Sequence, residues 1–116
     1  EGFQNIMYTV HFYAATHGEE LRQRTEDAVK SGIPVFISEC GAMEASGDGP
    51  VDMDSEEQWI SMCERLGISW LCWSISDKDE TCSMLLPQAK STGPWPDAVV
   101  KPYGKIVKNL LMKYNP

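Results

Sequence analysis

Three apolar runs in the chain predict three β-strands. They cover residues 5–13 (NIMYTVHFY), 33–38 (IPVFIS) and 68–75 (ISWLCWSI), and all three are rich in β-branched or aromatic residues. The second run is almost continuously apolar, which is typical of a strand buried on both faces of a parallel sheet. The pattern therefore favours a covered, parallel sheet over a half-exposed antiparallel one.

A segment with helical periodicity follows each predicted strand. The first spans about residues 18–30, and Gly32 is expected to cap its C-terminal end. The second is expected to begin at Ser55, which has the spacing of a capping box with Gln58, and to end at Gly67. The apolar stripes expected to face the core are Leu21, Thr25, Ala28 and Val29, then Trp59, Met62, Cys63 and Leu66, and in a last helix Val99, Tyr103, Ile106, Val107, Leu110, Leu111 and Tyr114.

Strand and helix thus alternate three times, with loops expected at residues 40–54 and 76–97. Repeated strand–helix units with buried strands predict a parallel α/β architecture. Three parallel strands cannot close a barrel, and their edges would be exposed. We therefore expect residues 1–116 to form one partial domain of a larger α/β protein. The chain starts at Glu1 without a Met or a charged leader, so we expect it to begin inside a longer gene product.

The composition limits the classes of partner that the protein is expected to bind. The 116 residues are 42% hydrophobic, enough for a modest core, and no apolar run reaches the ~20 residues needed to cross a bilayer. Ten basic and seventeen acidic residues give a net charge of −7. Nucleic acids and anionic membranes require a basic surface, so neither is an expected partner. A neutral substrate such as a polysaccharide is compatible with this charge.

The four cysteines give no sign of a metal site. None forms a CxxC pair and no His lies at ligand spacing from them, so we expect neither a zinc site nor any other cofactor. Cys40 and Cys72 lie in apolar strand runs and are expected to be free thiols in the core. The sequence leaves open whether Cys63 or Cys82 forms a disulfide.

Glu39 is the candidate catalytic carboxylate. It directly follows the second apolar run and precedes Cys40 and Gly41. A carboxylate at the end of a buried strand costs desolvation free energy unless it is paired or used in chemistry. In a βα barrel this end of the strands lines the active site. The alternative is a structural acid bound by a buried Arg or by backbone amides.

Aromatic and polar residues at the other strand ends strengthen this interpretation. His11 and Tyr13 are two residues apart and therefore share one face of their strand, where a phenol can orient a neighbouring carboxylate. Trp70 and Trp73 are three apart, so one should pack in the core and the other should project from the sheet. Trp73, at the strand end, is the candidate sugar platform. His11 and Tyr13 could instead be ordinary core or rim residues, and Trp59 and Trp95 are expected to pack.

The motifs resemble one enzyme family along essentially the whole chain. The segments NIMYTVHFYA, PVFISECG, EASGDG and ISWLCWSISDKDE look like the later part of glycoside hydrolase family 5, the cellulases, and are most similar to its bacterial endoglucanases. The resemblance implies a fragment of a retaining (β/α)8 TIM barrel that covers strands six to eight and their helices. It also implies a secreted protein that acts on β-glucan.

The resemblance also implies residue roles. Glu39 matches the nucleophile, Tyr13 matches its hydrogen-bond donor and His11 matches a residue that lines the cleft. Sugar contacts are implied for four further residues, namely Trp73 as the platform, Lys78, Glu80 and the backbone at Ala45. The chain departs from the family pattern at two positions. Cys40 stands where a Trp is usual, and Cys72 stands where an Asn is frequent.

The acid/base half of the site is missing from this sequence. The resemblance places that Glu in an Asn-Glu pair on strand four, and the chain contains no such dipeptide. Glu44, Asp77 and Glu80 lie in predicted loops and are poor substitutes. We therefore expect the parent enzyme to cleave internal β-1,4-glucosidic bonds and this chain alone to be inactive. We also expect it to pair with the missing N-terminal part of the barrel or to self-associate. The alternatives are a non-catalytic carbohydrate-binding or assembly fragment, a mannanase, and a mixed-linkage glucanase.

Overall fold

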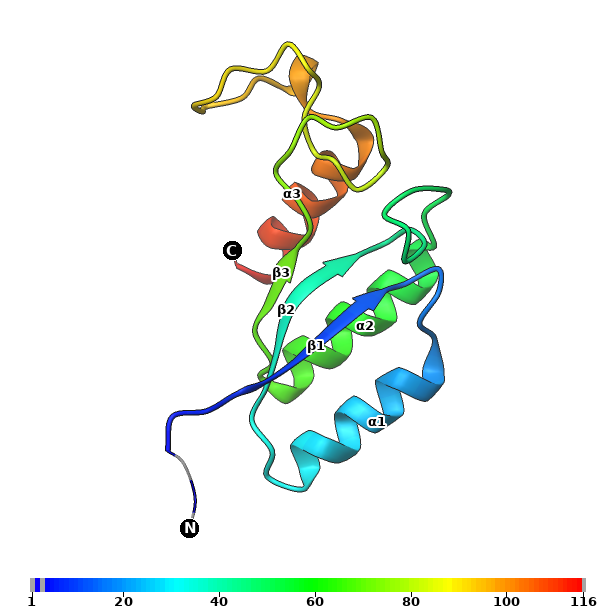
Figure 1. The fold of residues 1–116 in the computed structure, drawn as a ribbon, viewed down its shortest axis with the longest axis vertical. Helices are drawn as coiled ribbons and strands as arrows, with labels where there is room; N and C mark the ends of the chain where they lie inside the picture. The colour runs from blue at the N-terminus through cyan, green and yellow to red at the C-terminus, as the bar shows by residue number, and fades with distance from the viewer. Residues whose placement is uncertain (1, 3, 116) are drawn as a thin grey trace.

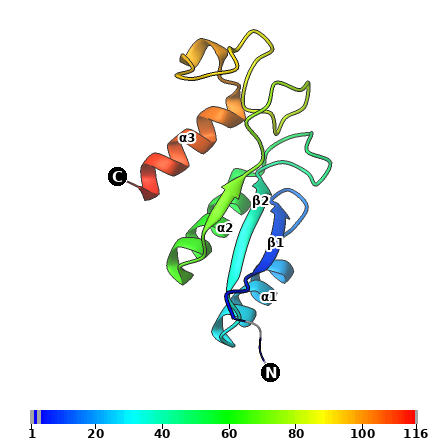
Figure 2. The ribbon, with the colours of Figure 1, turned by 60° about the vertical axis from the view of Figure 1, so that its left-hand side comes forward.

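The chain folds into a three-stranded parallel sheet with helices packed on one face (Figure 1; Figure 2). The computed structural model describes residues 2 and 4–115. The strands, in the order β1-β2-β3 across the sheet, are β1 (Tyr8–Tyr13), β2 (Val35–Gly41) and β3 (Trp70–Cys72). The helices are α1 (Glu19–Lys30), α2 (Met53–Leu66), the short 3₁₀ helix η1 (Asp97–Val99) and α3 (Pro102–Tyr114). The predicted alternation of parallel strands and helices is therefore confirmed.

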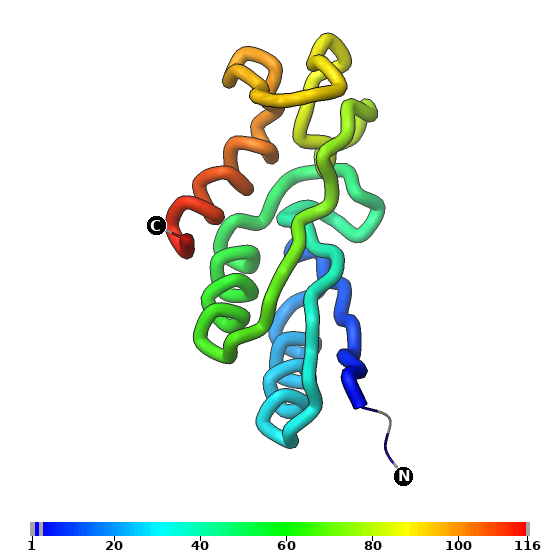
Figure 3. Tube along the Cα trace, turned by 90° about the vertical axis from the view of Figure 1, so that its left-hand side faces the viewer, coloured from blue at the N-terminus to red at the C-terminus, as the bar shows by residue number. Residues whose placement is uncertain are grey.

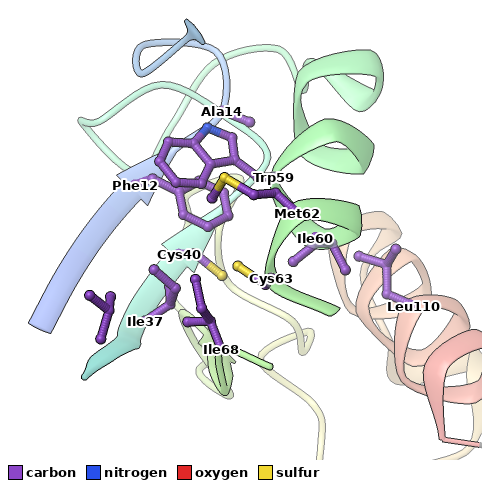
Figure 4. Packing of buried hydrophobic residues seen from close by; sticks show 11 residues of the cluster. Phe12, Ala14, Ile37, Cys40, Trp59, Ile60, Met62, Cys63, Ile68 and Leu110 are labelled. Carbon is purple, nitrogen blue, oxygen red and sulfur yellow. The ribbon is translucent and has the colours of Figure 1, made fainter. Parts of the chain in front are cut away.

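The main core lies between the sheet and the helices. Trp59 of α2 is completely buried and stacks on Phe12 of β1, with ring centroids 4.1 Å apart and planes inclined by 3° (Figure 4). The indole Nε1 donates a hydrogen bond of 2.7 Å to the carbonyl oxygen of His17, so its polar atom is satisfied inside the core. Ile37 of β2 and Leu110 of α3 pack in the same cluster. One continuous apolar layer thus joins the first strand to the last helix.

Several element boundaries differ from the predicted ones. β1 begins at Tyr8 rather than at residue 5, and β3 is limited to three residues. β2 begins later, at Val35, and extends to Gly41. The helix that was expected from Val99 onward is split, because Val99 ends the 3₁₀ turn and α3 starts at Pro102. Pro102 suits the first helical position because its missing N–H would have no partner there.

The predicted capping box of α2 is wrong. The helix begins at Met53, and its N-cap is Asp52, whose side chain accepts a hydrogen bond of 2.9 Å from the backbone N–H of Ser55. Ser55 therefore lies inside the first turn, and its backbone N–H is capped by Asp52 instead of its side chain acting as the cap. A carboxylate at this position also interacts favourably with the positive end of the helix dipole. Gly67 ends the helix in the left-handed conformation (φ 68°), as expected.

Several large apolar side chains on and beside the strands are exposed to solvent. Tyr8, Leu71 and Ile75 are among the large hydrophobic residues that the described chain leaves open to solvent. β1 and β3 are the two outer strands of the sheet. Exposed apolar strands at unpaired edges are what a piece of a closed barrel would present. None of the helices described by the structure has the length and apolar character of a membrane-spanning segment.

An ion pair between α1 and α2 predicts a pH effect. Both oxygens of Glu26 accept hydrogen bonds from Arg65, at 3.0 and 3.1 Å, and Lys30 lies 2.8 Å away. The hydrogen bonds from Arg65, and then from Lys30, lower the pKa of Glu26 to about 2. Because this folded-state pKa lies below the ordinary value of 4.5, the stabilisation is complete above pH ~4.5 and declines as the pH falls towards 2. Glu26→Gln should therefore lower the urea midpoint at pH 6, and the deficit should shrink towards pH 2.

The control for this prediction is Glu20→Gln, which removes an exposed carboxylate from the first turn of the same helix. A deficit for Glu26→Gln that stays constant with pH would contradict the assignment.

Candidate active site

A β-bulge in β2 places two successive polar side chains on the open face of the sheet. Ile37 pairs with Trp70 and Cys40 pairs with Cys72, so β2 advances by three residues where β3 advances by two. The pairing with β1 is irregular at the same place. Ile37 and Cys40 face the helices, so Ser38 and Glu39 both lie between them on the other side. Such bulges re-aim side chains and are frequent beside active sites.

Glu39 is held by two side chains from β1. The Tyr13 hydroxyl donates a hydrogen bond of 2.7 Å to Oε1 of Glu39, and Nδ1 of His11 lies 3.4 Å from Oε2. The Glu39 side chain is 25% exposed, so it stays partly accessible to solvent. The predicted neighbourhood of Glu39, Tyr13 and His11 is therefore present. No Arg within residues 4–115 bonds to Glu39, so the alternative of an Arg-paired structural acid finds no support.

The electrostatics keep Tyr13 in the donor state. Burial, followed by the hydrogen bond to Glu39, raises the pKa of the Tyr13 phenol above its usual value. The phenol therefore keeps its proton at neutral pH and can donate it in the hydrogen bond to Glu39. The hydrogen bond from Tyr13 therefore fixes the orientation of the Glu39 carboxylate.

Ser38 and Thr9 also belong to this site, although they are not among the site residues predicted from the sequence. Nε2 of His11 lies 2.9 Å from Oγ of Ser38, and Ser38 is in turn hydrogen-bonded to Oγ1 of Thr9. The hydroxyl pair thus holds the side of the His11 ring that faces away from Glu39. The available sequence signal was the polar pair Ser38-Glu39 at the end of an apolar strand, which does not fit strict alternation.

Trp73 is positioned beside this group and remains accessible. Its backbone N–H donates a hydrogen bond of 2.8 Å to the carbonyl oxygen of Cys40, the residue that follows Glu39. The residue is 48% exposed, and its peptide bond to Ser74 is cis. Trp70 instead packs against the main core, and its Nε1 donates to Glu64. One indole thus packs against the core and the other, just beyond the end of β3, is exposed, as their spacing predicts.

Two loops extend the site beyond the strand ends. Figure 3 shows the segment after β3 rising past the carboxyl end of the sheet, above the segment that follows β2. The two are tied together, because Cys82 N–H donates to Gly47 O at 2.9 Å and Thr81 donates to Asp48 through both its backbone N–H and its hydroxyl. The sequence-predicted sugar contacts Ala45, Lys78 and Glu80 lie on these loops.

The loop residues do not contact the carboxylate directly. Lys78 Nζ lies 3.6 Å from Oε1 of Glu80, and the backbone N–H of Ala45 donates to Oγ1 of Thr16. None of these three residues hydrogen-bonds to Glu39 within the described chain. The structure therefore brings Glu39, Tyr13, His11 and Trp73 together at the strand ends, and leaves Lys78, Glu80 and Ala45 in the surrounding loops.

Comparisons with known proteins agree with this arrangement. Residues 1–79 match the family model described as Cellulase (glycosyl hydrolase family 5). The chain is 41% identical over 104 residues to Endoglucanase A of Evansella cellulosilytica, which covers 90% of this chain and 21% of the relative.

Solved structures show the same fold. A structure from Cytophaga hutchinsonii is similar with a TM-score of 0.90 and 41% identity, over 97% of this chain and 37% of that one. The catalytic domain of a Thermobifida fusca endoglucanase, solved in complex with cellotetraose, gives a TM-score of 0.86 and 31% identity, over 93% of this chain and 35% of that one. The parallel strands and helices described above thus correspond to part of a barrel of this type.

The chain spans about a fifth of the length of the curated relative and little more than a third of each solved chain. The family match nevertheless covers more than half of this chain's 116 residues. From its sequence match and its fold, the chain belongs to glycosyl hydrolase family 5, the cellulase family.

Proposed function

We propose that the protein containing these residues is an endo-β-1,4-glucanase that hydrolyses cellulose or a related β-glucan with retention, and that Glu39 is its nucleophile. The observation that carries the proposal is the 2.7 Å hydrogen bond from Tyr13 to Glu39 on the open face of the sheet. A surface acid does not need a buried phenol to orient it, whereas an attacking carboxylate does. The endoglucanase relatives support the substrate class.

The proposed reaction has two steps. An oxygen of Glu39 attacks the anomeric carbon of a glucosyl unit, the glycosidic C–O bond breaks, and the leaving oxygen takes a proton from a second carboxylic acid. Water then attacks the glycosyl–enzyme ester, with the second group acting as base, and Glu39 is released as a carboxylate. The acid/base group must lie about 5–5.5 Å from the nucleophile for retention. We assign it to the part of the barrel outside this chain, because the chain has no Asn-Glu pair.

The remaining residues have proposed binding roles. Trp73 offers an exposed indole face beside Glu39, suited to the apolar C–H face of a sugar ring. Lys78 and Glu80, held in a pair at 3.6 Å, would bind glucose hydroxyls further along the chain of sugars. The backbone at Ala45 would approach the same sugars from the neighbouring loop. Tyr13 and His11 position the nucleophile.

The proposal also concerns what surrounds the chain. The three strands would be strands six, seven and eight of the barrel, and the exposed apolar residues on β1 and β3 would be covered by its N-terminal part or by self-association. A polymeric substrate cannot enter a cell, so we place the parent enzyme outside it.

The first test is the isolated chain. On carboxymethylcellulose, mannan and mixed-linkage β-glucan, the 116-residue chain should release no reducing ends above the background of a Glu39→Gln variant. Turnover that Glu39→Gln abolishes would mean that the chain holds its own second carboxylate. Binding to these polysaccharides without turnover even after the barrel is completed would instead favour the carbohydrate-binding alternative.

A further inference from the structure

A cluster of two cysteines and one glutamate lies on the helix-facing side of the sheet, opposite Glu39. Cys40 of β2 and Cys72 of β3 are paired in the strand register, and their sulfur atoms are 3.8 Å apart. Glu56 of α2 approaches them from the helix layer. One ligand atom from each of the three residues lies within 4.8 Å of the other two.

Glu56 is an unusual residue for this place. It is completely buried (0% exposed), and both of its carboxylate oxygens lack a hydrogen-bond partner. Burial, and then the nearby charge of Glu57, raises the pKa of Glu56 to about 7. A buried polar group without a partner is costly, and in a native protein it calls for an explanation such as a bound ion. The proposed hydrolytic reaction makes no use of this carboxylate.

The geometry of the cluster matches a particular ion. Two thiolates bound to a tetrahedral Zn²⁺ at about 2.3 Å are about 3.8 Å apart, which is the separation of the Cys40 and Cys72 sulfurs. A carboxylate oxygen is an accepted third ligand for zinc. Cys63 of α2 also points toward Cys40 (Figure 4), so a further sulfur lies in the same layer.

We propose that Cys40, Cys72 and Glu56 form a structural binding site for a thiophilic divalent cation, with Zn²⁺ as the best fit. The inference stands apart from the proposed hydrolase function. Sequence spacing argued against a zinc site, because Cys40 and Cys72 are 32 positions apart and only strand pairing makes them neighbours. The two cysteines also occupy both positions at which the chain departs from the family pattern.

Binding follows a defined proton balance. Two thiols and one carboxylic acid lose three protons to solvent, three metal–ligand bonds form, and the +2 ion leaves the cluster with a net charge of −1. Without an ion, burial opposes ionisation, and the pKa of Cys40 is raised, first by its hydrogen bond with Cys72 and then by burial. Affinity should therefore increase with pH, since the protons compete with the metal.

The site would join three elements around the catalytic edge. Cys40 directly follows Glu39, Cys72 directly precedes Trp73, and Glu56 lies in the first turn of α2. Tyr103 of α3 closes the same region, because its hydroxyl donates to the Cys40 carbonyl oxygen at 3.3 Å. A bound ion would fix the strand that carries the nucleophile against the strand that carries the sugar platform.

The test uses Co²⁺ as a spectroscopic substitute for Zn²⁺. The full chain, reduced and freed of metal under anaerobic conditions, is titrated with Co²⁺ and then with Zn²⁺. We expect one equivalent of Co²⁺ to produce a sulfur-to-cobalt charge-transfer band, and one equivalent of Zn²⁺ to remove it. Cys72→Asn, which introduces the residue frequent in the family, should abolish most of this band.

Two further variants separate the site from general thiol binding. Glu56→Gln should keep the sulfur band but weaken Co²⁺ binding by at least about tenfold. Cys82→Ser removes a buried thiol that lies against Gly47, outside the cluster, and should leave affinity and stoichiometry unchanged. Far-UV circular dichroism checks that each variant is folded.

Three results would overturn the proposal. They are the absence of saturable Co²⁺ binding, equal affinity in Glu56→Gln and the unmodified chain, and a disulfide between Cys40 and Cys72, identified by peptide mass spectrometry in the chain purified without reductant.

Discussion

Glu39→Gln is expected to reduce cellulose hydrolysis by at least about 10⁴-fold in kcat once the barrel is complete. The complete form can be made by substituting this chain for the matching segment of the Evansella cellulosilytica endoglucanase, which covers 90% of it at 41% identity. The glutamine amide keeps the size of the side chain, and its oxygen can still accept a hydrogen bond from Tyr13. In the unmodified chain the Tyr13 hydroxyl lies 2.7 Å from Oε1 of Glu39. The amide cannot form the glycosyl ester, so the loss should appear in kcat with little change in KM.

The matched control is Glu44→Gln, an exposed loop carboxylate that should leave the rate unchanged. Proton NMR of the first products supplies an independent readout, because a retaining reaction releases the β-anomer before mutarotation. A Glu39→Gln enzyme with more than a tenth of the original kcat, or first products of the α-configuration, would remove Glu39 from the role of nucleophile.

Trp59→Ala is expected to destabilise the chain by about 3–5 kcal/mol. The variant removes the stack on Phe12, 4.1 Å between centroids, and leaves the carbonyl oxygen of His17 without its 2.7 Å hydrogen bond. It also removes the ring beneath the guanidinium of Arg22, which lies 5.9 Å from the centroid. Because small domains are stable by only about 5–15 kcal/mol, this loss removes a large part of the stability, and the urea midpoint should fall markedly.

Urea unfolding followed by circular dichroism measures this loss. Trp59→Phe keeps an aromatic ring against Phe12 but no indole N–H, and should cost less than Trp59→Ala. Equal losses for the two variants would mean that the hydrogen bond to His17, and not the stacking, fixes the position of α2.

The sequence predicted the features that depend on residue pattern. The three strands, their alternation with helices and the contrast between packed Trp70 and exposed Trp73 all follow from periods of two or of about 3.6 residues, and the structure contains them. The meeting of Tyr13 and Glu39 also follows from topology, since the carboxyl ends of neighbouring parallel strands share one edge. The α/β fold is therefore predictable from the sequence pattern.

The features that sequence did not predict depend on long-range contacts. The bulge beside Ser38 changes which face a residue occupies, and a regular period cannot anticipate an inserted residue. The N-cap of α2 is Asp52, because the local backbone geometry decides which of several suitable nearby residues caps the helix. Glu56 is not part of the apolar stripe predicted for this helix, although the packing of α2 on the sheet buries it completely.

The parallel order of the three strands limits how copies of this chain could combine. If two copies met through like edges about a twofold axis, their strands would run in opposite directions or their helices would lie on opposite faces of the joint sheet. If β1 of one copy paired with β3 of the next, all strands would stay parallel, but each copy would add three strands to the sheet. An eight-stranded cylinder cannot be reached in such steps. Self-association can therefore cover the open edges, but only a segment of different sequence can complete the ring.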